Sequence, residues 1–266
     1  MDKLNQENSA GIVRKPTLDE WFLILQLKCI KKQFHLPFYI DIDVTKLANK
    51  FMAANRKVPY TALLIKASSI LLEECPHMNI AIFHTFLGVK IVDFKYNIVN
   101  LPIAIVRDGK YMLTATTIEN AFMKSIHEIR SEIKSAAAKD LSDLPLNKLL
   151  HYGKNNFFNR LKLRTMHFMF NNFPKKYLKF RAGGIGVSSL MNKSNIDLPL
   201  AMMAYGNTGL TIGSCAEYQN AEKRFLKVGI ALDHMVCHGE VGVAAIMQFS
   251  EILTATNDKH FKMLTT

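Results

Sequence analysis

The segment that most constrains the fold is residues 228–249, near the C-terminus. Apolar residues alternate over 228–232, which is typical of a strand, and they recur with helical spacing over 241–249. Two histidines, His234 and His238, lie between these patterns. A titratable side chain at the tip between a strand and a helix can reach a cleft, so His234 is a candidate catalytic base. The alternative is a histidine with no catalytic role.

The same segment resembles a known signature. Asp233, His234, His238 and Gly239 match the Asp-His-Arg-x-x-Asp-Gly motif of the acyltransferase catalytic domains of 2-oxoacid dehydrogenase complexes. Those domains are part of the chloramphenicol acetyltransferase-like superfamily. This chain departs from the motif at two positions, because Met235 replaces the Arg and His238 replaces the Asp, which is Asn in some members.

Four further segments are similar to segments of that family and occur in the same order. They are HLPFYIDIDVTKL at 35–47, YTALLIKASSILLEECPHMN at 60–79, NLPIAIVRDG at 100–109 and GGIGVSSLM at 183–191. The resemblance covers nearly the whole chain. It implies an α/β (two-layer α+β) fold, in which helices pack on a mixed sheet.

The sequence patterns themselves predict an alternation of helices and strands. Helices are expected at 17–30, 44–55, 60–75, 116–138 and 240–255. Strands are expected at 38–44, 80–86, 89–94, 98–106, 185–189, 200–205, 210–213 and 225–232, with turns at Gly88 and 107–109. Two of the helix starts rest on capping-box spacing, Thr17 with Glu20 and Thr116 with Glu119. Without a repeat or a flexible linker, we expect one acyltransferase-like domain over 1–266.

The resemblance also implies a mechanism. The family histidine, here His234, takes a proton from a thiol or hydroxyl acceptor, which attacks a thioester carbonyl. A serine, by position Ser188, steadies the oxyanion. The family is trimeric, and the two residues meet across a subunit interface, so a homotrimer or a higher assembly is implied. Acyl-CoA or an acyl carrier protein would be the co-substrate, with no covalently bound cofactor. For Ser188 the residues alone favour a strand serine bonded to backbone.

The replacement at His238 leaves the activity open. In the family the Asp pairs with an arginine of the N-terminal helix, and those positions here are Phe22 and Lys28. His238 is therefore a neutral loop residue, a second base or acceptor-binding group, or the mark of an inactive site. In the last case the chain would be a trimeric scaffold or binding module. No lipoyl-lysine segment is found, so we expect a stand-alone relative.

Composition indicates a globular protein in a reducing compartment. The chain has 266 residues, of which 49% are hydrophobic, and no apolar run is long enough to span a bilayer. The N-terminus lacks an apolar signal core, and the four cysteines form no CxxC pair, so we expect a cytoplasmic protein. Cys237 could join His234 and His238 in a metal site only if the segment were helical, so no metal is expected.

The net charge of +12 is concentrated in one region. Residues 144–196 contain no Asp or Glu and ten Lys or Arg, nine of which fall in a basic block at 146–181. The family has a short connection here, so we interpret 146–180 as an insertion, with amphipathic helices expected at 146–163 and 164–173 before Pro174.

Three interpretations of this insertion remain open. It could present a solvated helix face and pack on its own core. It could bind an acidic acyl carrier protein or the phosphates of coenzyme A. It could also attach the protein peripherally to an anionic membrane, since the block mixes aromatic and cationic residues. Nucleic-acid binding is not expected, because no recognised DNA- or RNA-binding motif is present.

Overall fold

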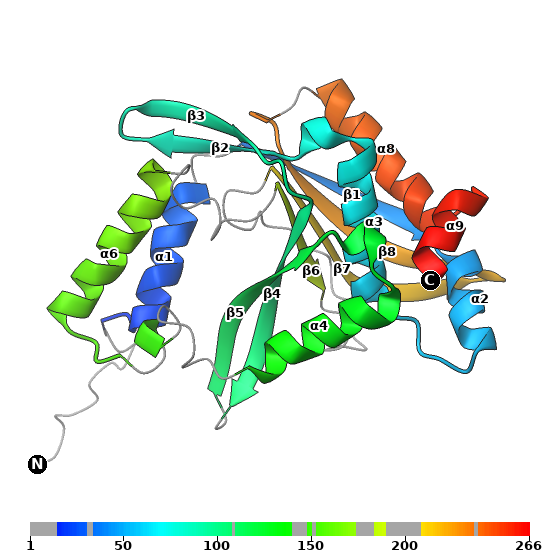
Figure 1. Cartoon of the computed structure of the whole chain (residues 1–266), viewed down its shortest axis with the longest axis horizontal. Helices are drawn as coiled ribbons and strands as arrows, with labels where there is room; N and C mark the ends of the chain where they lie inside the picture. The colour runs from blue at the N-terminus through cyan, green and yellow to red at the C-terminus, as the bar shows by residue number, and fades with distance from the viewer. Residues whose placement is uncertain are drawn as a thin grey trace, which may run out of the picture.

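A mixed sheet covered by helices on one face forms the centre of the molecule (Figure 1). A computed structural model gives the fold. It describes residues 15–30, 34–107, 110–139, 148–150, 153–173, 184–189, 209–236 and 239–266. The predicted strand at 200–205 and the predicted turn residues 108–109 lie outside these ranges.

The central sheet has six strands in the order β1-β8-β7-β6-β4-β5. In chain order these are β1 (His35–Asp43), β4 (Ile98–Arg107), β5 (Lys110–Glu119), β6 (Ile185–Ser189), β7 (Leu210–Asn220) and β8 (Lys223–Asp233). β6 runs parallel to both β4 and β7, and the other neighbours are antiparallel. The predicted mixed sheet is therefore confirmed.

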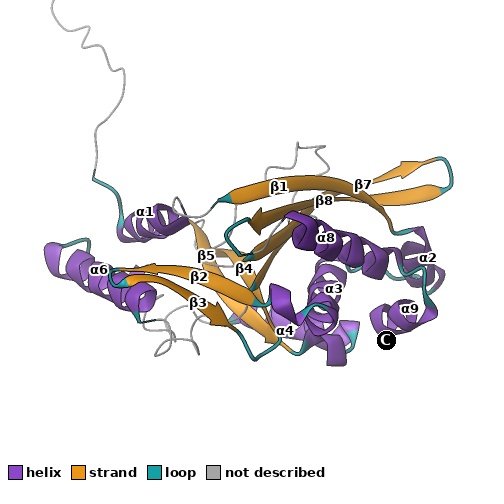
Figure 2. Cartoon of the chain, turned by 90° about the horizontal axis from the view of Figure 1, so that it is seen from above, coloured by secondary structure: helices purple, strands orange, loops and turns teal. Residues whose placement is uncertain are grey.

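Helices cover the face of the sheet to which the apolar residues of each strand point. Because side chains alternate along a strand, Leu226, Val228, Ile230 and Leu232 of β8 all lie in the core on this side. The covering helices are α2 (Thr45–Ala53), α3 (Tyr60–Glu74), α4 (Ile126–Ala138), α8 (Gly239–Thr254) and α9 (Asp258–Thr265). Figure 2 shows these helices gathered on one side of the strands.

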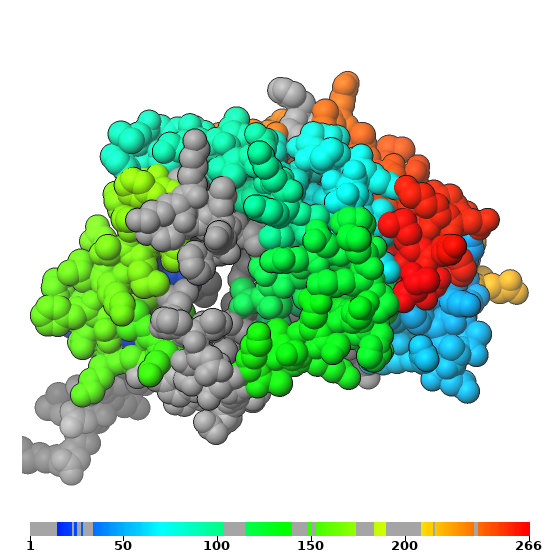
Figure 3. Space-filling model, in the orientation of Figure 1, coloured from blue at the N-terminus to red at the C-terminus, as the bar shows by residue number. Residues whose placement is uncertain are grey.

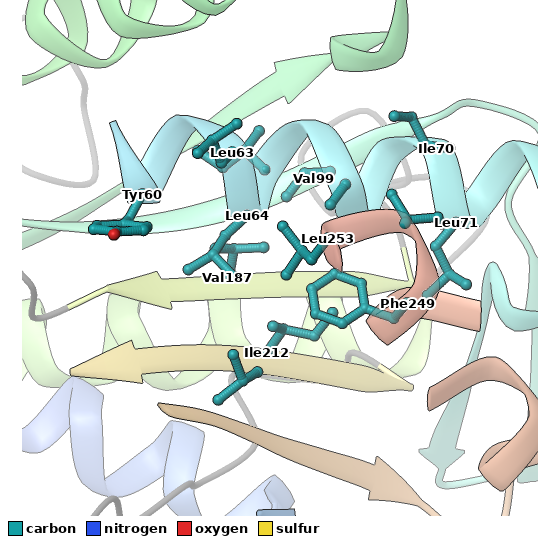
Figure 4. Packing of buried hydrophobic residues seen from close by; sticks show 14 of the residues in the cluster. Tyr60, Leu63, Leu64, Ile70, Leu71, Val99, Val187, Ile212, Phe249 and Leu253 are labelled. Carbon is teal, nitrogen blue, oxygen red and sulfur yellow. The ribbon is translucent and has the colours of Figure 1, made fainter. Parts of the chain in front are cut away.

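α3 is the central core element. Its residues are buried almost all round, from Tyr60 to Leu72, as an apolar helix without a polar face requires. Figure 4 shows Leu64 and Leu71 of α3 packing with Phe249 of α8 and Val187 of β6. The predicted burial of this helix is confirmed. Short 3₁₀ segments, η1 (Pro76–Met78) and η2 (Ala121–Met123), follow α3 and β5.

A separate two-stranded sheet projects beside the main one. β2 (Ile80–Thr85) and β3 (Gly88–Asp93) form an antiparallel hairpin. Gly88 has φ +113°, a conformation that L side chains rarely adopt, which explains a glycine at this turn. The turn predicted near Gly88 is confirmed.

One predicted helix start is wrong. Residues 110–119 form β5, which pairs with β4 over its whole length, and the helix begins later at Ile126. The true capping box is Ser125 with Glu128, in which Glu128 N donates to Ser125 Oγ and Ser125 N donates to the Glu128 carboxylate. The Thr116–Glu119 spacing matches the same motif, but pairing with β4 overrides it.

The insertion also differs from its prediction. Residues 148–150 are helical as expected, but α6 (Phe157–Asn172) runs without a break across the boundary predicted between 163 and 164. Asn156 sets its start, since the Asn156 side chain accepts a hydrogen bond from Asn159 N. The predicted end near Phe173 is confirmed.

α6 packs beside α1 (Leu18–Ile30), away from the main helical layer (Figure 1). The Arg160 guanidinium lies 5.6 Å from the centre of the Trp21 ring and donates to the Pro16 carbonyl at 2.6 Å. The predicted capping box at Thr17 and Glu20 is present, with Thr17 N donating to Glu20 Oε2 at 2.8 Å. Among the residues that the structure describes, none of the helices is both long and apolar enough to cross a bilayer.

Glu74, at the end of α3, anchors the C-terminal helix α9. Its carboxylate accepts hydrogen bonds from Lys259 Nζ at 2.7 Å and Gln248 Nε2 at 2.6 Å, and His260 Nε2 lies 3.0 Å away. Partial burial raises the pKa of Glu74, but the hydrogen bonds from Lys259, His260 and Gln248 outweigh it and bring the pKa from 4.5 to about 2. α9 was not predicted from the sequence.

This anchor should make stability depend on pH. A folded-state pKa below the unfolded value gives stabilisation that is complete above pH 4.5 and lost as the pH falls toward about 2. We expect Glu74→Gln to lower the free energy of unfolding by about 2 kcal/mol at neutral pH, a value reduced for partial solvent exposure. Denaturant titrations should show that the difference in free energy of unfolding between the variant and wild type becomes smaller as the pH falls through this range. Glu251→Gln, at an exposed position on α8, is the control and should have little effect.

Candidate active site

The candidate site lies where β8 ends, beside the starts of β1 and β7. Asp233 N donates to the Gly209 carbonyl at 2.9 Å, next to the start of β7. His234 N donates to the Phe34 carbonyl at 2.7 Å, next to the start of β1. These two hydrogen bonds join the β8 end to both neighbouring strands, so the backbone of His234 is fixed by the sheet.

Asp233 shapes the turn that follows. The side chain is fully buried, and its Oδ1 accepts hydrogen bonds from Met235 N at 3.1 Å and Phe34 N at 3.3 Å. Val236 N donates to the Asp233 carbonyl, which closes the turn. Within the described residues, Asp233 Oδ2 has no hydrogen-bond partner. The carboxylate therefore works mainly as an acceptor that ties the amide after His234 to the amide of Phe34, which precedes β1.

His35 faces Asp233 across the β1–β8 ladder. Its Nε2 is buried and, in the part of the chain that is described, also has no hydrogen-bond partner. Burial lowers the pKa of His35, while the charge of Asp233 opposes that shift. Sequence analysis did not single out His35, because the residue with which it pairs is nearly 200 positions away in the chain.

The side chain of His234 points away from the core. It is exposed, and its ring centre lies 6.2 Å from that of Phe34 at a tilt of 44°. A Cβ atom added to Gly239 would lie 4.0 Å from His234 Cε1, so the imidazole lies over the first residue of α8. The predicted placement of His234 between a strand and a helix is confirmed.

His238 and Cys237 lie outside the described residues, so the roles considered for His238 stay predictions. Of the residues whose placement is described, no group of three His, Cys, Asp or Glu side chains could hold a metal ion.

Ser188 lies on the opposite face of the sheet from the helices. Val187 is buried in the core, and the alternation of β6 therefore turns Ser188 to the other side. Ser189 points toward the helices, where Thr61 Oγ1 donates to its hydroxyl at 2.9 Å. Of the two serines, only Ser188 thus lies on the face that the core helices leave uncovered.

Two glycines lie in a row with Ser188 across the neighbouring strands on that face. Ser188 is opposite Gly213 in β7, Gly213 is opposite Gly229 in β8, and Gly229 is opposite Tyr39 in β1. Glycines inside strands often mark a close approach of a ligand or another backbone, because they carry no side chain. Sequence analysis did not single out this row. The sequence does contain a glycine in each of two predicted strands, but only the strand register shows that Gly213 and Gly229 are level with each other.

The structure does not bring Ser188 and His234 together within one chain. The strand register places Ser188 level with Gly229, five residues before His234 and two strands away. At about 3.3 Å per residue and about 4.8 Å per strand, their Cα atoms lie roughly 15–20 Å apart. This separation exceeds the reach of two side chains toward one reacting atom, so a shared site requires residues from two chains.

Solved structures similar to this chain include acyltransferase catalytic cores. The truncated catalytic core of the 2-oxoacid dehydrogenase complex of Thermoplasma acidophilum is 17% identical, with a TM-score of 0.64 over 93% of this chain and 99% of that one. Dihydrolipoamide acetyltransferase of Azotobacter vinelandii is 16% identical, with a TM-score of 0.63 over 96% of each chain. The cubic core of a pyruvate dehydrogenase complex is also 16% identical, with a TM-score of 0.61 over 96% of each.

The chain therefore has the fold of the 2-oxoacid dehydrogenase acyltransferase cores, as its motifs predicted. No protein-family model matches the sequence, and no curated protein sequence matches it significantly. At this level of identity the likeness establishes the fold, and the chemistry has to be argued from the site.

The Asp233 acceptor should be required for stability. We expect Asp233→Ala to lower the free energy of unfolding by about 1–3 kcal/mol, because two backbone amides lose their acceptor. Asp93→Ala, on an exposed position of β3, is the control and should cost less than about 0.5 kcal/mol. Equal losses in the two variants, measured by urea unfolding, would show that Asp233 does not hold the turn.

Proposed function

We propose that this protein is an acyltransferase. It moves an acyl group from a thioester, on coenzyme A or an acyl carrier protein, to a small-molecule or lipid-like nucleophile. The observation that carries this proposal is the exposed imidazole of His234, whose backbone is fixed to strands β1 and β8. A base held on rigid elements but open to solvent can meet a substrate in a defined orientation.

In the proposed reaction, His234 takes the proton from the acceptor hydroxyl or thiol as its oxygen or sulfur bonds to the thioester carbonyl carbon. The Ser188 hydroxyl donates a hydrogen bond to the oxyanion that forms. The intermediate then breaks its carbon–sulfur bond, and the leaving thiolate receives the proton from His234. Base catalysis contributes about 10²–10⁴-fold and one oxyanion donor about 10²–10³-fold.

In the Azotobacter vinelandii acetyltransferase, a serine, a histidine and an asparagine have been investigated for their role in the catalytic mechanism. The histidine and asparagine are four positions apart, as His234 and His238 are here. This parallel supports Ser188 and His234 in the roles above. We assign His238 to the loop or to acceptor binding.

Gly213 and Gly229, which are level with Ser188 and carry no side chains, support Ser188 as the oxyanion donor. They leave room beside the hydroxyl for an extended substrate arm. The wide separation of Ser188 and His234 supports a site shared by two chains. We therefore propose a cyclic homotrimer, in which His234 of one chain meets Ser188 of the next. The assembly of the pyruvate dehydrogenase core into a cubic particle is consistent with self-association of this fold.

The proposed mechanism predicts how turnover changes when its residues are replaced. With acyl-CoA donors and a panel of hydroxyl and thiol acceptors, His234→Ala should reduce thiol release by about 10²–10⁴-fold and Ser188→Ala by about 10²–10³-fold. The controls are His127→Ala, an exposed histidine on α4, and Ser189→Ala, the neighbouring serine of β6. Turnover unaffected by loss of His234 would reject the mechanism. Absence of any turnover in the wild type would favour the alternative of an inactive scaffold.

The proposed sharing of the site between two chains can be tested by mixing variants. If His234→Ala and Ser188→Ala chains are co-expressed and assemble at random, about one interface in four receives an intact histidine and an intact serine. The mixture should therefore regain about a quarter of wild-type activity, although each variant alone is nearly inactive. A mixture as inactive as its components would show that the two residues do not form one site between chains.

A further inference from the structure

The outward face of α6 presents large apolar side chains to solvent. Phe157 is 72% exposed, Phe158 76%, Leu161 49% and Phe168 47%. Phe157, Leu161 and Phe168 lie on one side of the helix, since their spacings of four and seven residues are close to whole turns. Scattered apolar residues are normal on a surface, but a contiguous set on one helix face marks an interaction site.

The opposite face of α6 already holds the helix in place. Leu163 is fully buried, and Arg160 on that side stacks on Trp21 of α1. On the side of Phe168, one turn later, Asn172 Oδ1 accepts a hydrogen bond from Phe86 N at 2.6 Å and Asn172 Nδ2 donates to the Phe168 carbonyl, so the β2–β3 hairpin also holds the end of α6. None of these contacts involves Phe157 or Phe158, whose rings contact each other edge to face.

The tip of the β2–β3 hairpin extends this apolar face. Phe86 is 60% exposed and Leu87 74%. The Phe86 ring stacks on Phe168 at 5.8 Å between centres and lies 6.2 Å from Phe173. Figure 3 shows α6 in yellow-green and the hairpin in teal meeting at one margin of the molecule. We call the hairpin tip and the outward face of α6 the aromatic surface.

The charge on α6 itself is uniformly positive. Lys162 and Arg164 are exposed. By helical spacing Arg164 lies within the line of apolar residues, one turn before Phe168, and Lys162 lies one turn after Phe158. The helix contains no acidic residue, and neither does the whole stretch 144–196. The ligand that matches this surface is therefore both apolar and anionic.

We propose that the aromatic surface docks on an anionic lipid bilayer. Aromatic side chains insert at the boundary between headgroups and acyl chains, while flanking Lys and Arg attract anionic headgroups. A symmetric contact with a second copy would bring Lys162 and Arg164 against the same cations, which is unfavourable. The proposal is independent of the acyl-transfer chemistry, since none of its residues belongs to the candidate active site.

Vesicle flotation of the full-length protein tests this. We expect binding to phosphatidylcholine vesicles that contain phosphatidylglycerol, and much weaker binding to phosphatidylcholine alone. Phe157→Ser with Phe158→Ser should weaken the partition about tenfold or more, through lost apolar insertion. Lys162→Glu with Arg164→Glu should weaken it about 30-fold or more, at about fivefold for each cation removed.

The matched control is Tyr96→Ser with Met123→Ser, which removes two apolar side chains that are 73% and 76% exposed on other elements. It should float like wild type. Equal flotation of all variants, or no preference for phosphatidylglycerol, would overturn the proposal. So would a change of oligomeric state in the phenylalanine variant by sedimentation velocity, which would make the aromatic surface an interface between copies. Acyl transfer to a soluble acceptor should be unchanged in every variant, which separates this test from that of the proposed function.

Discussion

The candidate site depends on the hydrogen bonds that join the end of β8 to the starts of β1 and β7. Asp233 is their centre, because its backbone bonds to Gly209 and its buried carboxylate accepts from the amides of Met235 and Phe34. The sheet thereby fixes the direction in which the His234 side chain leaves the chain. An exposed imidazole would otherwise lose conformational entropy whenever it engaged a substrate, and fixing its backbone reduces that cost.

The same sheet explains why the proposed site would need two chains. Its helix-covered face holds the core, while Ser188 and the glycines beside it lie on the other face. His234 lies beyond the end of β8, well outside the reach of Ser188. The geometry therefore divides the proposed machinery into a base at one place and an oxyanion donor at another. Assembly of like chains is the simplest way to join them.

Local patterns predicted the elements whose burial is strong and continuous, such as α3 and α8, and the resemblance indicated the mixed sheet. They failed where a long-range contact decides the structure. Capping-box spacing at Thr116 suggested a helix, yet pairing with β4 makes that segment a strand. The sequence likewise indicated His234 through its position between two patterns. It could not indicate the pairing of His35 with Asp233, which depends on strand register between distant segments.

The central claim is that His234 and the Ser188 of an adjacent chain act on one carbonyl. The most direct measurement is an experimental structure of the assembled protein with a non-reactive acyl-CoA analogue. The account predicts the His234 imidazole within about 3 Å of the acceptor position and a neighbouring Ser188 hydroxyl within hydrogen-bond distance of the thioester oxygen. A structure in which His234 is closed off from the pantetheine arm, or in which Ser188 meets no other chain, would contradict it.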